Sequence, residues 1–227
     1  MQGALAGEVR LADYRNVIFD RLGTGDGLSH AGVSAITQDQ DGFIWMGTQE
    51  GLNRYDGYKF STYYHLPDDP QSVSHDSIWD LLSDSKGHLW VGTDAGLNRF
   101  RAAEDNFESI SLDQVSTGEP DKDHGAVFVL FEDTKGRIWI GTSTGLVRMD
   151  TDGRMVHFHH DHQNSQSLSK GSVRAIYEDL SGKIWVATEL GGLNRFDETG
   201  QTFAHYEANP DDPTSISDNY IRFILEV

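Results

Sequence analysis

Close variants of the string "DGFIWMGTQEGLNRYDG" at residues 41–57 occur three more times along the chain, and this internal repeat constrains the fold more than any other feature. The copies are separated by 45, 49 and 46 residues and are centred on Trp45, Trp90, Trp139 and Trp185. A second recurring segment, such as "VFVLFED" at 127–133, begins twelve residues before each tryptophan. A period of about 46 residues is typical of helical arrays or of β-propellers.

Within each copy the residue pattern favours four short β-strands. The first segment is β-branched and aromatic with a nearly continuous apolar core, which is typical of a strand buried on both faces. An Asp-x-x-Gly turn, such as 84–87, leads to "HLWVGT", and a glycine-bearing turn then leads to "LNRF". A pair of aromatic or apolar residues three apart, such as Phe107 and Ile110, marks a fourth strand. The sequence therefore predicts an all-β chain of propeller blades, each with four antiparallel strands.

The repeats predict four complete blades, at about 33–77, 78–126, 127–172 and 173–220. "IRFILEV" at 221–227 begins a fifth copy, and "NVIFDRL" at 16–22 resembles an outer strand. We expect a leader remnant or a disordered start over 1–15 and one partial propeller over 16–227. The orphan strands at both ends cannot pair with each other within one blade, which favours part of a larger propeller. The alternative is that a second copy of the chain supplies the missing strands through the exposed blade edges.

Composition excludes several classes of function. Acidic residues outnumber basic ones 36 to 18, a formal net charge of −18, which argues against binding to nucleic acid or to anionic lipid. The chain has no cysteine, hence no disulfide or thiolate metal site, and no apolar run reaches the roughly 18 residues of a membrane span. It also lacks a nucleophile elbow, a phosphate-binding glycine loop and a His-Glu-x-x-His motif. We therefore predict no enzyme, no cofactor, no metal and no direct membrane insertion in these residues.

The repeat pattern Asp-x-x-Gly-x-(Ile/Leu)-Trp-(Val/Ile)-Gly-Thr-x-x-Gly-Leu-Asn-Arg-(Phe/Tyr) resembles the two-component regulator propeller repeat. Linkers such as "LPDDPQSVSHDSI" at 66–78 support the same resemblance, which covers about 16–227. The chain departs from the pattern at Val147, where the other copies have Asn, and by an inserted glycine at Gly191 or Gly192. Both departures lie in the hairpin between the second and third strands.

The resemblance implies the periplasmic, ligand-sensing part of a bacterial receptor. In this family a propeller of about seven blades lies outside the inner membrane, and a transmembrane helix leads to a histidine kinase, often hybrid, or to a diguanylate cyclase. The expected partners are a small-molecule or saccharide ligand and the rest of the receptor chain. Two alternatives stay open: a propeller resembling polysaccharide lyases or hydrolases, and a carbohydrate- or protein-binding scaffold.

Strand direction predicts where a ligand would bind. The loops between the second and third strands should lie at the same end of the blades as the variable linkers, and a rigid scaffold with a variable rim is the usual place for a binding site. The candidate ligand-contacting residues are those of these loops: Gln49, Glu50, Asp94, Ser143, Thr144 and Glu189.

Other recurring residues are interpreted as architecture. The tryptophans are expected to wedge between neighbouring blades. One arginine also recurs in each blade, and we expect it to pair with the repeated carboxylate fifteen or sixteen residues earlier: Arg54, Arg99, Arg148 and Arg195 with Asp39, Asp84, Asp133 and Asp179. The run "HFHHDH" contains suitable metal ligands in His157–His162, but His157 aligns with His205 in the next repeat, which favours an ordinary surface position.

Overall fold

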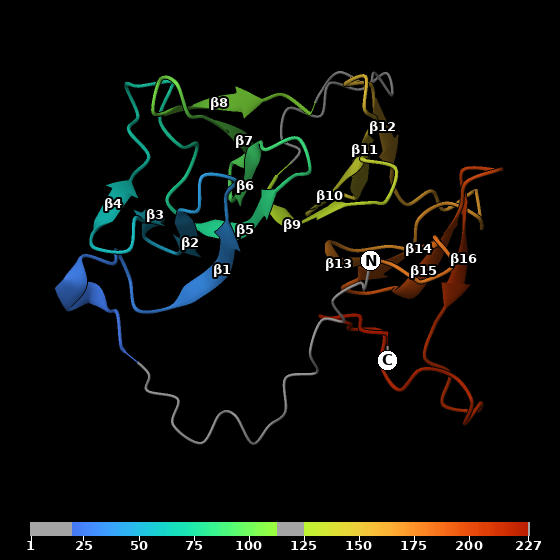
Figure 1. Ribbon diagram of the computed structural model, residues 1–227. Coiled ribbons are helices and arrows are strands. Elements are labelled where there is room, and N and C mark those ends of the chain that lie inside the picture. The colour runs from blue at the N-terminus through green and yellow to red at the C-terminus, as the bar shows by residue number, and fades with distance from the viewer. Residues whose placement is uncertain (1–19, 113–124, 227) are drawn as a thin grey trace, which may run out of the picture.

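The computed structural model describes residues 20–112 and 125–226. Sixteen strands form four antiparallel sheets of four strands each, which confirms the predicted all-β architecture of four blades. The blades follow one another in chain order around an arc (Figure 1). The predicted leader remnant at 1–15 and the larger part of the predicted outer strand at 16–22 lie outside the described residues. Within the described ranges, no helix is long or apolar enough to cross a membrane.

Each blade runs through its strands in sequence order. A short 3-10 helix, η2 (Thr24–Asp26), precedes them. Blade 1 contains β1 (Val33–Gln38), β2 (Ile44–Thr48), β3 (Gly51–Tyr55) and β4 (Phe60–Tyr63). Blade 2 contains β5 (Ile78–Ser83), β6 (Leu89–Thr93), β7 (Gly96–Arg101) and β8 (Asn106–Ile110). Blade 3 contains β9 (Val127–Glu132), β10 (Ile138–Thr142), β11 (Leu146–Met149) and β12 (Met155–Phe158). Blade 4 contains β13 (Val173–Glu178), β14 (Ile184–Thr188), β15 (Gly192–Asp197) and β16 (Thr202–Tyr206).

The core lies between the blades. Trp45 and Leu52 of blade 1 are fully buried in one cluster with Ile78, Leu89 and other apolar residues of blade 2, and the next two interfaces repeat this arrangement. The first strands of consecutive blades lie beside one another, so these strands form the inner rim of the arc. The apolar faces of the repeated strands are therefore buried against the neighbouring blade.

A close approach between blades explains the glycine before the threonine in the second strand of blades 1 to 3; blade 4 has Ala187 there. A Cβ atom added at Gly47 would lie 2.6 Å from Cγ2 of Ile78, and one at Gly92 would lie 2.8 Å from Cγ1 of Val127. In both cases the clashing side chain begins the first strand of the next blade. The glycine therefore allows consecutive blades to pack at this spacing.

The first strand of every blade carries a β-bulge near its beginning. The pairing of β1 with β2 passes from Val33 directly to Ala35, and β5, β9 and β13 skip one residue at the same point. A bulge takes one residue out of the ladder and re-aims its side chain. The bulged residues of the four blades are Ser34, Trp79, Phe128 and Arg174.

The repeated aspartate and tryptophan form a hydrogen bond at the turn after each first strand. In blade 3 the Nε1–H group of Trp139 donates to Oδ2 of Asp133 at 2.8 Å, while Oδ1 of Asp133 accepts the backbone N–H groups of Lys135 and Arg137. The same indole–carboxylate bond measures 2.7 Å in blade 1 and 2.8 Å in blades 2 and 4. One carboxylate thus fixes both the tight turn and the tryptophan that reaches into the next interface.

The predicted pairing of the repeated arginines with these aspartates is wrong. Each arginine instead lies opposite the tryptophan of its own blade in the ladder, as Arg148 lies opposite Trp139. The guanidinium carbon is 5.6–5.9 Å from the tryptophan ring in all four blades, within the range of a cation–π contact. Three of the repeated arginines pair with other carboxylates: Arg54 with Asp105, Arg99 with Glu108 and Arg148 with Asp150.

Buried polar side chains attach the linkers to the blades. In blade 2 the Nδ2–H group of Asn98 donates to Oγ of Ser74 at 2.8 Å, and Ser74 also bonds Oγ1 of Thr93 at 2.8 Å. Blades 1 and 4 contain the same set of three side chains. In blade 3 the asparagine position holds Val147, which is buried in the apolar cluster between blades 2 and 3.

Candidate functional site

The linkers meet the loops between the second and third strands at one end of the blades. The N–H group of Asp94, for example, donates to the carbonyl of Ser77, and that of Glu189 donates to the carbonyl of Ser172. We call this the linker end and the opposite end, with the Asp-x-x-Gly turns, the turn end. Strand direction predicted this arrangement. In each antiparallel blade, the loop between the second and third strands lies at the same end as the linkers.

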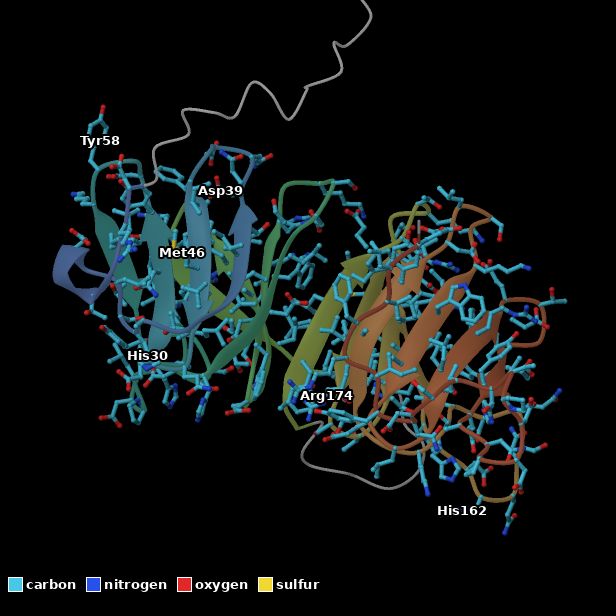
Figure 2. The ribbon with its side chains drawn as sticks, turned by 90° about the horizontal axis from the view of Figure 1, so that it is seen from below. His30, Asp39, Met46, Tyr58, His162 and Arg174 are labelled. Atoms are coloured by element: carbon cyan, nitrogen blue, oxygen red, sulfur yellow. The ribbon has the colours of Figure 1, made fainter. Side chains whose placement is uncertain are left out.

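Figure 2 shows the two ends directly. His30 and His162, which belong to linkers, lie toward the same end as Arg174, whereas Asp39 and Tyr58 lie at the opposite end. Arg174 is also located between the blades at the two extremes of the arc, on its inner side. The bulge therefore places this side chain at the inner rim of the linker end.

Two aromatic side chains meet at this inner rim. The rings of Trp79 and Phe128 are 5.1 Å apart at an interplanar angle of 85°, an edge-to-face pair across blades 2 and 3. The Nε1–H group of Trp79 donates to Oδ1 of Asp94 at 2.6 Å, which fixes the orientation of the indole. Trp79 is nevertheless 36% exposed, unlike the buried tryptophans of the repeat. Its ring is available for stacking against a ligand.

A guanidinium group completes the cluster from blade 4. Cζ of Arg174 lies 3.8 Å from the ring centre of Phe128 and 6.0 Å from that of Trp79. Nη2 of Arg174 donates to Oε2 of Glu189 at 3.0 Å. Its Nε atom is buried and, among the described residues, has no hydrogen-bond partner. We call Trp79, Phe128, Arg174, Asp94 and Glu189 the rim cluster.

A half-buried carboxylate, Asp80, follows Trp79 in β5. Oδ2 of Asp80 accepts the backbone N–H group of Leu130 at 2.7 Å and so joins β5 to β9 beside the Trp79–Phe128 pair. Burial raises the pKa of Asp80 to about 6, although the backbone hydrogen bonds act in the opposite direction. The corresponding residues of the other blades are Ala35, Val129 and Ala175. Asp80 positions the two strands that carry the aromatic pair.

The structure brings together two of the six predicted ligand-contacting residues. Asp94 orients the exposed ring of Trp79, and Glu189 orients the half-buried side chain of Arg174. Gln49, Glu50, Ser143 and Thr144 lie in the equivalent loops of blades 1 and 3, where Glu50 and Thr144 donate their backbone N–H groups to the preceding threonine. A ligand contact by any of the six stays a prediction.

Sequence reasoning missed Trp79, Phe128 and Arg174, although a signal was present. The residues on either side of them are apolar in every blade except for Asp80 in blade 2, whereas the bulged residue itself is Ser, Trp, Phe or Arg. A position that varies inside a strongly repeated strand is a candidate for an asymmetric site. The prediction concentrated on loops, and these three residues belong to strands.

The histidines at 157–162 connect strands to linkers. Nε2 of His157 bonds the carbonyl of Leu112 at 2.9 Å, and Nδ1 of His160 bonds the carbonyl of Leu168 at 3.0 Å. His157 is half-buried, with part of its ring at the surface. His205 makes the equivalent bond to the carbonyl of Ser167. Within the described ranges, no group of three or more His, Asp or Glu residues is arranged to hold a metal ion.

Comparison with known proteins agrees with the repeat architecture. The sequence pattern named "Two component regulator propeller" matches residues 27–50, 72–95 and 122–144, which include the Asp-x-x-Gly turn and tryptophan of blades 1 to 3. Three of the four blades therefore contain the two component regulator propeller repeat. The sequence is also 41% identical to histidine kinase P4 of Formosa agariphila over 63 residues, which are 28% of this chain and 5% of the kinase.

Solved structures with the same fold include sensors and enzymes. The extracellular domain of a hybrid two component system from B. thetaiotaomicron has a TM-score of 0.68 and 22% identity, over 84% of this propeller chain and 24% of that chain. Virginiamycin B lyase from Staphylococcus aureus has a TM-score of 0.57 and 17% identity, over 81% of this chain and 56% of that chain. At these identities the similarity establishes the propeller fold alone.

Proposed function

We propose that this chain is a ligand-recognition segment, outside the cytoplasmic membrane and in the periplasm, of a receptor of the two-component type. The family repeats and the match to a histidine kinase support this role. The chain spans only a small share of that kinase, so the signalling output, whether kinase or diguanylate cyclase, would reside elsewhere in the receptor. On this proposal the propeller binds and does not catalyse.

The observation that carries the proposal is the rim cluster. The aspartate–indole bond and the arginine–tryptophan contact recur in all four blades, as structural contacts of a repeat do. The bulged residues differ in each blade, and three of them, Trp79, Phe128 and Arg174, meet at the inner rim of the linker end. Differences between otherwise equivalent positions are what a site for one asymmetric ligand requires.

The side chains of the rim cluster suit a small polar ligand with a flat or apolar face. Trp79 offers an exposed ring, and Arg174 offers hydrogen-bond donors, while Asp94 and Glu189 hold both side chains in place and have further acceptor capacity. A saccharide has this combination of hydroxyl groups and C–H faces. We therefore propose a small molecule of this kind, rather than nucleic acid, as the partner; the net charge of −18 supports the exclusion.

Calorimetric titration with a panel of neutral and uronic mono- and oligosaccharides tests the proposal. We expect a binder whose affinity falls about tenfold or more in Trp79→Ala and Arg174→Gln, since each loses contacts worth at least about 1.4 kcal/mol. Tyr58→Ala is the matched control, because Tyr58 is 94% exposed at the turn end. Equal affinity in all three variants would place the site elsewhere.

The same samples distinguish a sensor from an enzyme. Mass spectrometry of the saccharide after prolonged incubation should recover it unchanged. Cleavage or elimination products would show that this propeller is a lyase or hydrolase, the activity class to which one structural neighbour belongs.

A further inference from the structure

A pocket of about 250 Å³ lies between blades 1 and 2 and shares no residue with the rim cluster. It is bounded by the end of β4, by the linker that follows β4 and by the turn between β7 and β8. Because β4 and β8 are the last strands of their blades, the pocket lies on the outer side of the arc (Figure 1). We call it the outer pocket.

The buried side of the outer pocket belongs to the repeated architecture. Val73 and Phe107 are buried, and the N–H group of Phe107 donates to the carbonyl of Gln71 at 2.8 Å. Between blades 3 and 4 the N–H group of Phe203 donates to the carbonyl of Gln166 at the same distance. The linker is thus fixed to the next blade in both places, and any specific role of the outer pocket depends on its other walls.

Tyr64 forms one wall of the outer pocket, and a glycine holds its ring. The ring lies against the backbone of Gly51, where an added Cβ atom would be 3.1 Å from Cδ1 and Cε1 of Tyr64. Gly51 has a φ of 121°, which glycine adopts without strain. Tyr64 is nevertheless 49% exposed. Its ring therefore offers a fixed aromatic surface to a ligand.

Asp105 forms another wall and is held by two donors. Its Oδ1 atom accepts from Nη1 of Arg54 at 3.0 Å and from the hydroxyl of Tyr63 at 2.7 Å. Burial, and then the bond to Asp105, raise the pKa of Tyr63, so the hydroxyl stays a donor. Among the described residues, Oδ2 of Asp105 accepts no hydrogen bond. One oxygen of a positioned carboxylate is therefore left for a ligand.

A second carboxylate, Asp69, lines the outer pocket from the linker. Its Oδ1 atom accepts the backbone N–H group of Gln71 at 2.9 Å, and Asn164 and Asp212 make the same bond in the later linkers. The turn needs only this one oxygen. In the part of the chain that the structure describes, Oδ2 of Asp69 has no hydrogen-bond partner. Asp69 thus adds a second available carboxylate oxygen.

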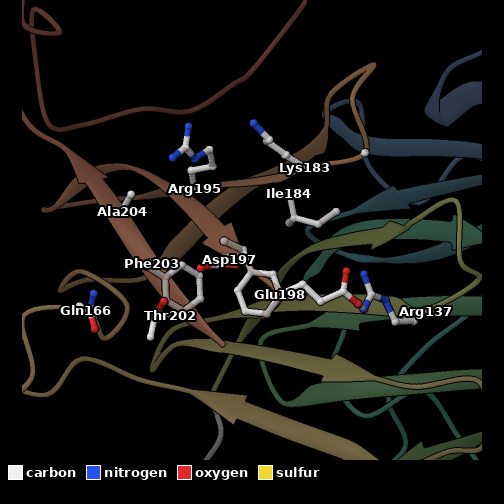
Figure 3. Close-up of a pocket in the computed structure, with 12 residues that line it drawn as sticks. Arg137, Gln166, Lys183, Ile184, Arg195, Asp197, Glu198, Thr202, Phe203 and Ala204 are labelled. Atoms are coloured by element: carbon white, nitrogen blue, oxygen red, sulfur yellow. Dashed lines mark hydrogen bonds and ion pairs between the residues drawn. The ribbon is translucent and has the colours of Figure 1, made fainter. Parts of the chain in front are cut away.

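The outer pocket differs in charge from a larger pocket on blade 4. The larger pocket, of about 410 Å³, is lined by Arg137, Lys183 and Arg195 as well as by acidic residues (Figure 3). No lysine, arginine or histidine within the described ranges lines the outer pocket, whose charged lining residues are Asp69 and Asp105. Arg54 neutralises Asp105 only in part, through the other oxygen. The charge of the outer pocket therefore favours a cation.

The polar and aromatic walls are specific to this interface. Leu66, which is 53% exposed, adds an apolar side chain to the ring of Tyr64 and the two carboxylates. At the equivalent places between blades 3 and 4, the residues corresponding to Tyr64, Leu66, Asp69 and Asp105 are His159, Asp161, Asn164 and Gln201. The combination is therefore not required by the repeat.

We propose that the outer pocket is a binding site for an organic cation, an ammonium group on a short apolar carrier. The ammonium group contacts the ring of Tyr64 and is neutralised by Asp69 and Asp105, while the carrier packs on Leu66. An aromatic surface beside carboxylates, with no basic side chain, is the chemistry that recognises such a cation. This site is independent of any ligand at the rim cluster.

Titration of 15N-labelled protein with choline, n-butylammonium and 3,3-dimethyl-1-butanol tests the proposal, because the last is a neutral isostere of choline. We expect at least one cation to shift the amide signals of Tyr64, Asp105 and Asn106 at roughly millimolar concentration, as a ligand of about seven non-hydrogen atoms allows. The neutral isostere should bind at least about fivefold more weakly, and raising the ionic strength should weaken binding of the cation.

Three results would overturn the proposal. The first is that neither cation shifts these signals, and the second is that the neutral isostere binds as well as choline. The third is that calcium chloride or a neutral sugar shifts the signals where neither organic cation does, which would assign the outer pocket to another class of ligand.

Asp69→Asn tests the contribution of charge and keeps the turn, because Asn164 makes the same bond in the third linker. We expect binding of the cation to weaken about two- to fivefold, as for an exposed ion pair. Asp212→Asn is the matched control, since it makes the same change in net charge in the equivalent turn of the last linker. Equal losses of affinity in the two variants would show a general charge effect and contradict the site.

Tyr64→Ala tests the aromatic wall. It should weaken binding of the cation about two- to fivefold, whereas Tyr64→Phe keeps the ring and should retain most of the affinity. His159→Ala, at the equivalent position after β12, is the control and should have no effect. A loss in Tyr64→Phe as large as that in Tyr64→Ala would contradict a contact between the cation and the ring.

Discussion

The two ends of the blades differ in how strictly they repeat. At the turn end every blade has the same aspartate, the same indole hydrogen bond and the same cation–π contact, so each blade is nearly interchangeable. At the linker end the bulged residues are different in each blade, and three of them gather into one cluster. The repeated contacts of the turn end therefore maintain the spacing of the blades, whereas the side chains of the linker end differ from blade to blade.

The tryptophans provide the largest expected contrast between the ends. Trp139→Ala removes a fully buried side chain from the interface of blades 3 and 4 and should lower the free energy of unfolding by about 3–5 kcal/mol. Trp79→Ala, at the linker end, should cost only about 1 kcal/mol, mostly from the pair with Phe128. Urea unfolding followed by circular dichroism measures both. Similar losses of unfolding free energy in the two variants would show that Trp79 is also a structural residue.

A second contrast uses two aspartates that both accept an indole N–H group. Asp133→Asn should lower the free energy of unfolding by about 2–3 kcal/mol, because the buried carboxylate also pairs with Arg137 at 2.6 Å and accepts two backbone bonds. Asp94→Asn should cost less than about 1 kcal/mol, since Asp94 is exposed and serves mainly to orient Trp79. The prediction fails if the ranking is reversed in urea unfolding at pH 7.

The pH dependence of stability distinguishes the carboxylates of the two ends. The hydroxyl of Ser181, the indole of Trp185 and the backbone of Lys183 lower the pKa of Asp179, so its contribution to stability is lost as the pH falls. Burial raises the pKa of Asp80 to about 6, so the folded state binds more protons than the unfolded state between about pH 4 and 6. Its contribution to stability therefore decreases as the pH rises through that range.

Asp80→Asn isolates this effect because it removes the charge and keeps an acceptor for the N–H group of Leu130. We expect the variant to be more stable than the parent chain at pH 7, by about 1–2 kcal/mol, with a difference that shrinks toward pH 4. Thermal unfolding from pH 4 to 8 provides the measurement. A constant difference across this range would contradict the raised pKa.

The blades could be predicted from sequence because each contact that defines them recurs. The constant spacing between "VFVLFED" and Trp139 fixes the first two strands, and the aromatic pairs locate the fourth. The Asp133–Trp139 bond could not be separated from an Asp–Arg pair by spacing alone, because both residues repeat with the aspartate. The ladder register decides between them, because it places Arg148 opposite Trp139, where its guanidinium group pairs with Asp150.

The rim cluster could not be predicted because it depends on where three bulges point. Trp79, Phe128 and Arg174 are separated by 49 and 46 residues and become neighbours only when the blades curve around a common inner rim. The loops at the linker end were found from strand direction, and with them Asp94 and Glu189. Asp94 and Glu189 orient Trp79 and Arg174 through contacts between strands and loops. These contacts do not recur along the sequence, so the repeat pattern does not reveal them.

Indole N–H resonances test the central claim most directly. The chain has five tryptophans, four with an indole bonded to an aspartate at the turn end and one, Trp79, bonded to Asp94 at the rim cluster. Titration of 15N-labelled protein with the saccharide panel should shift the Trp79 signal selectively, and Trp79→Phe should assign it. A ligand that shifts the other four signals and leaves Trp79 unmoved, or a panel without any binder, would contradict the account.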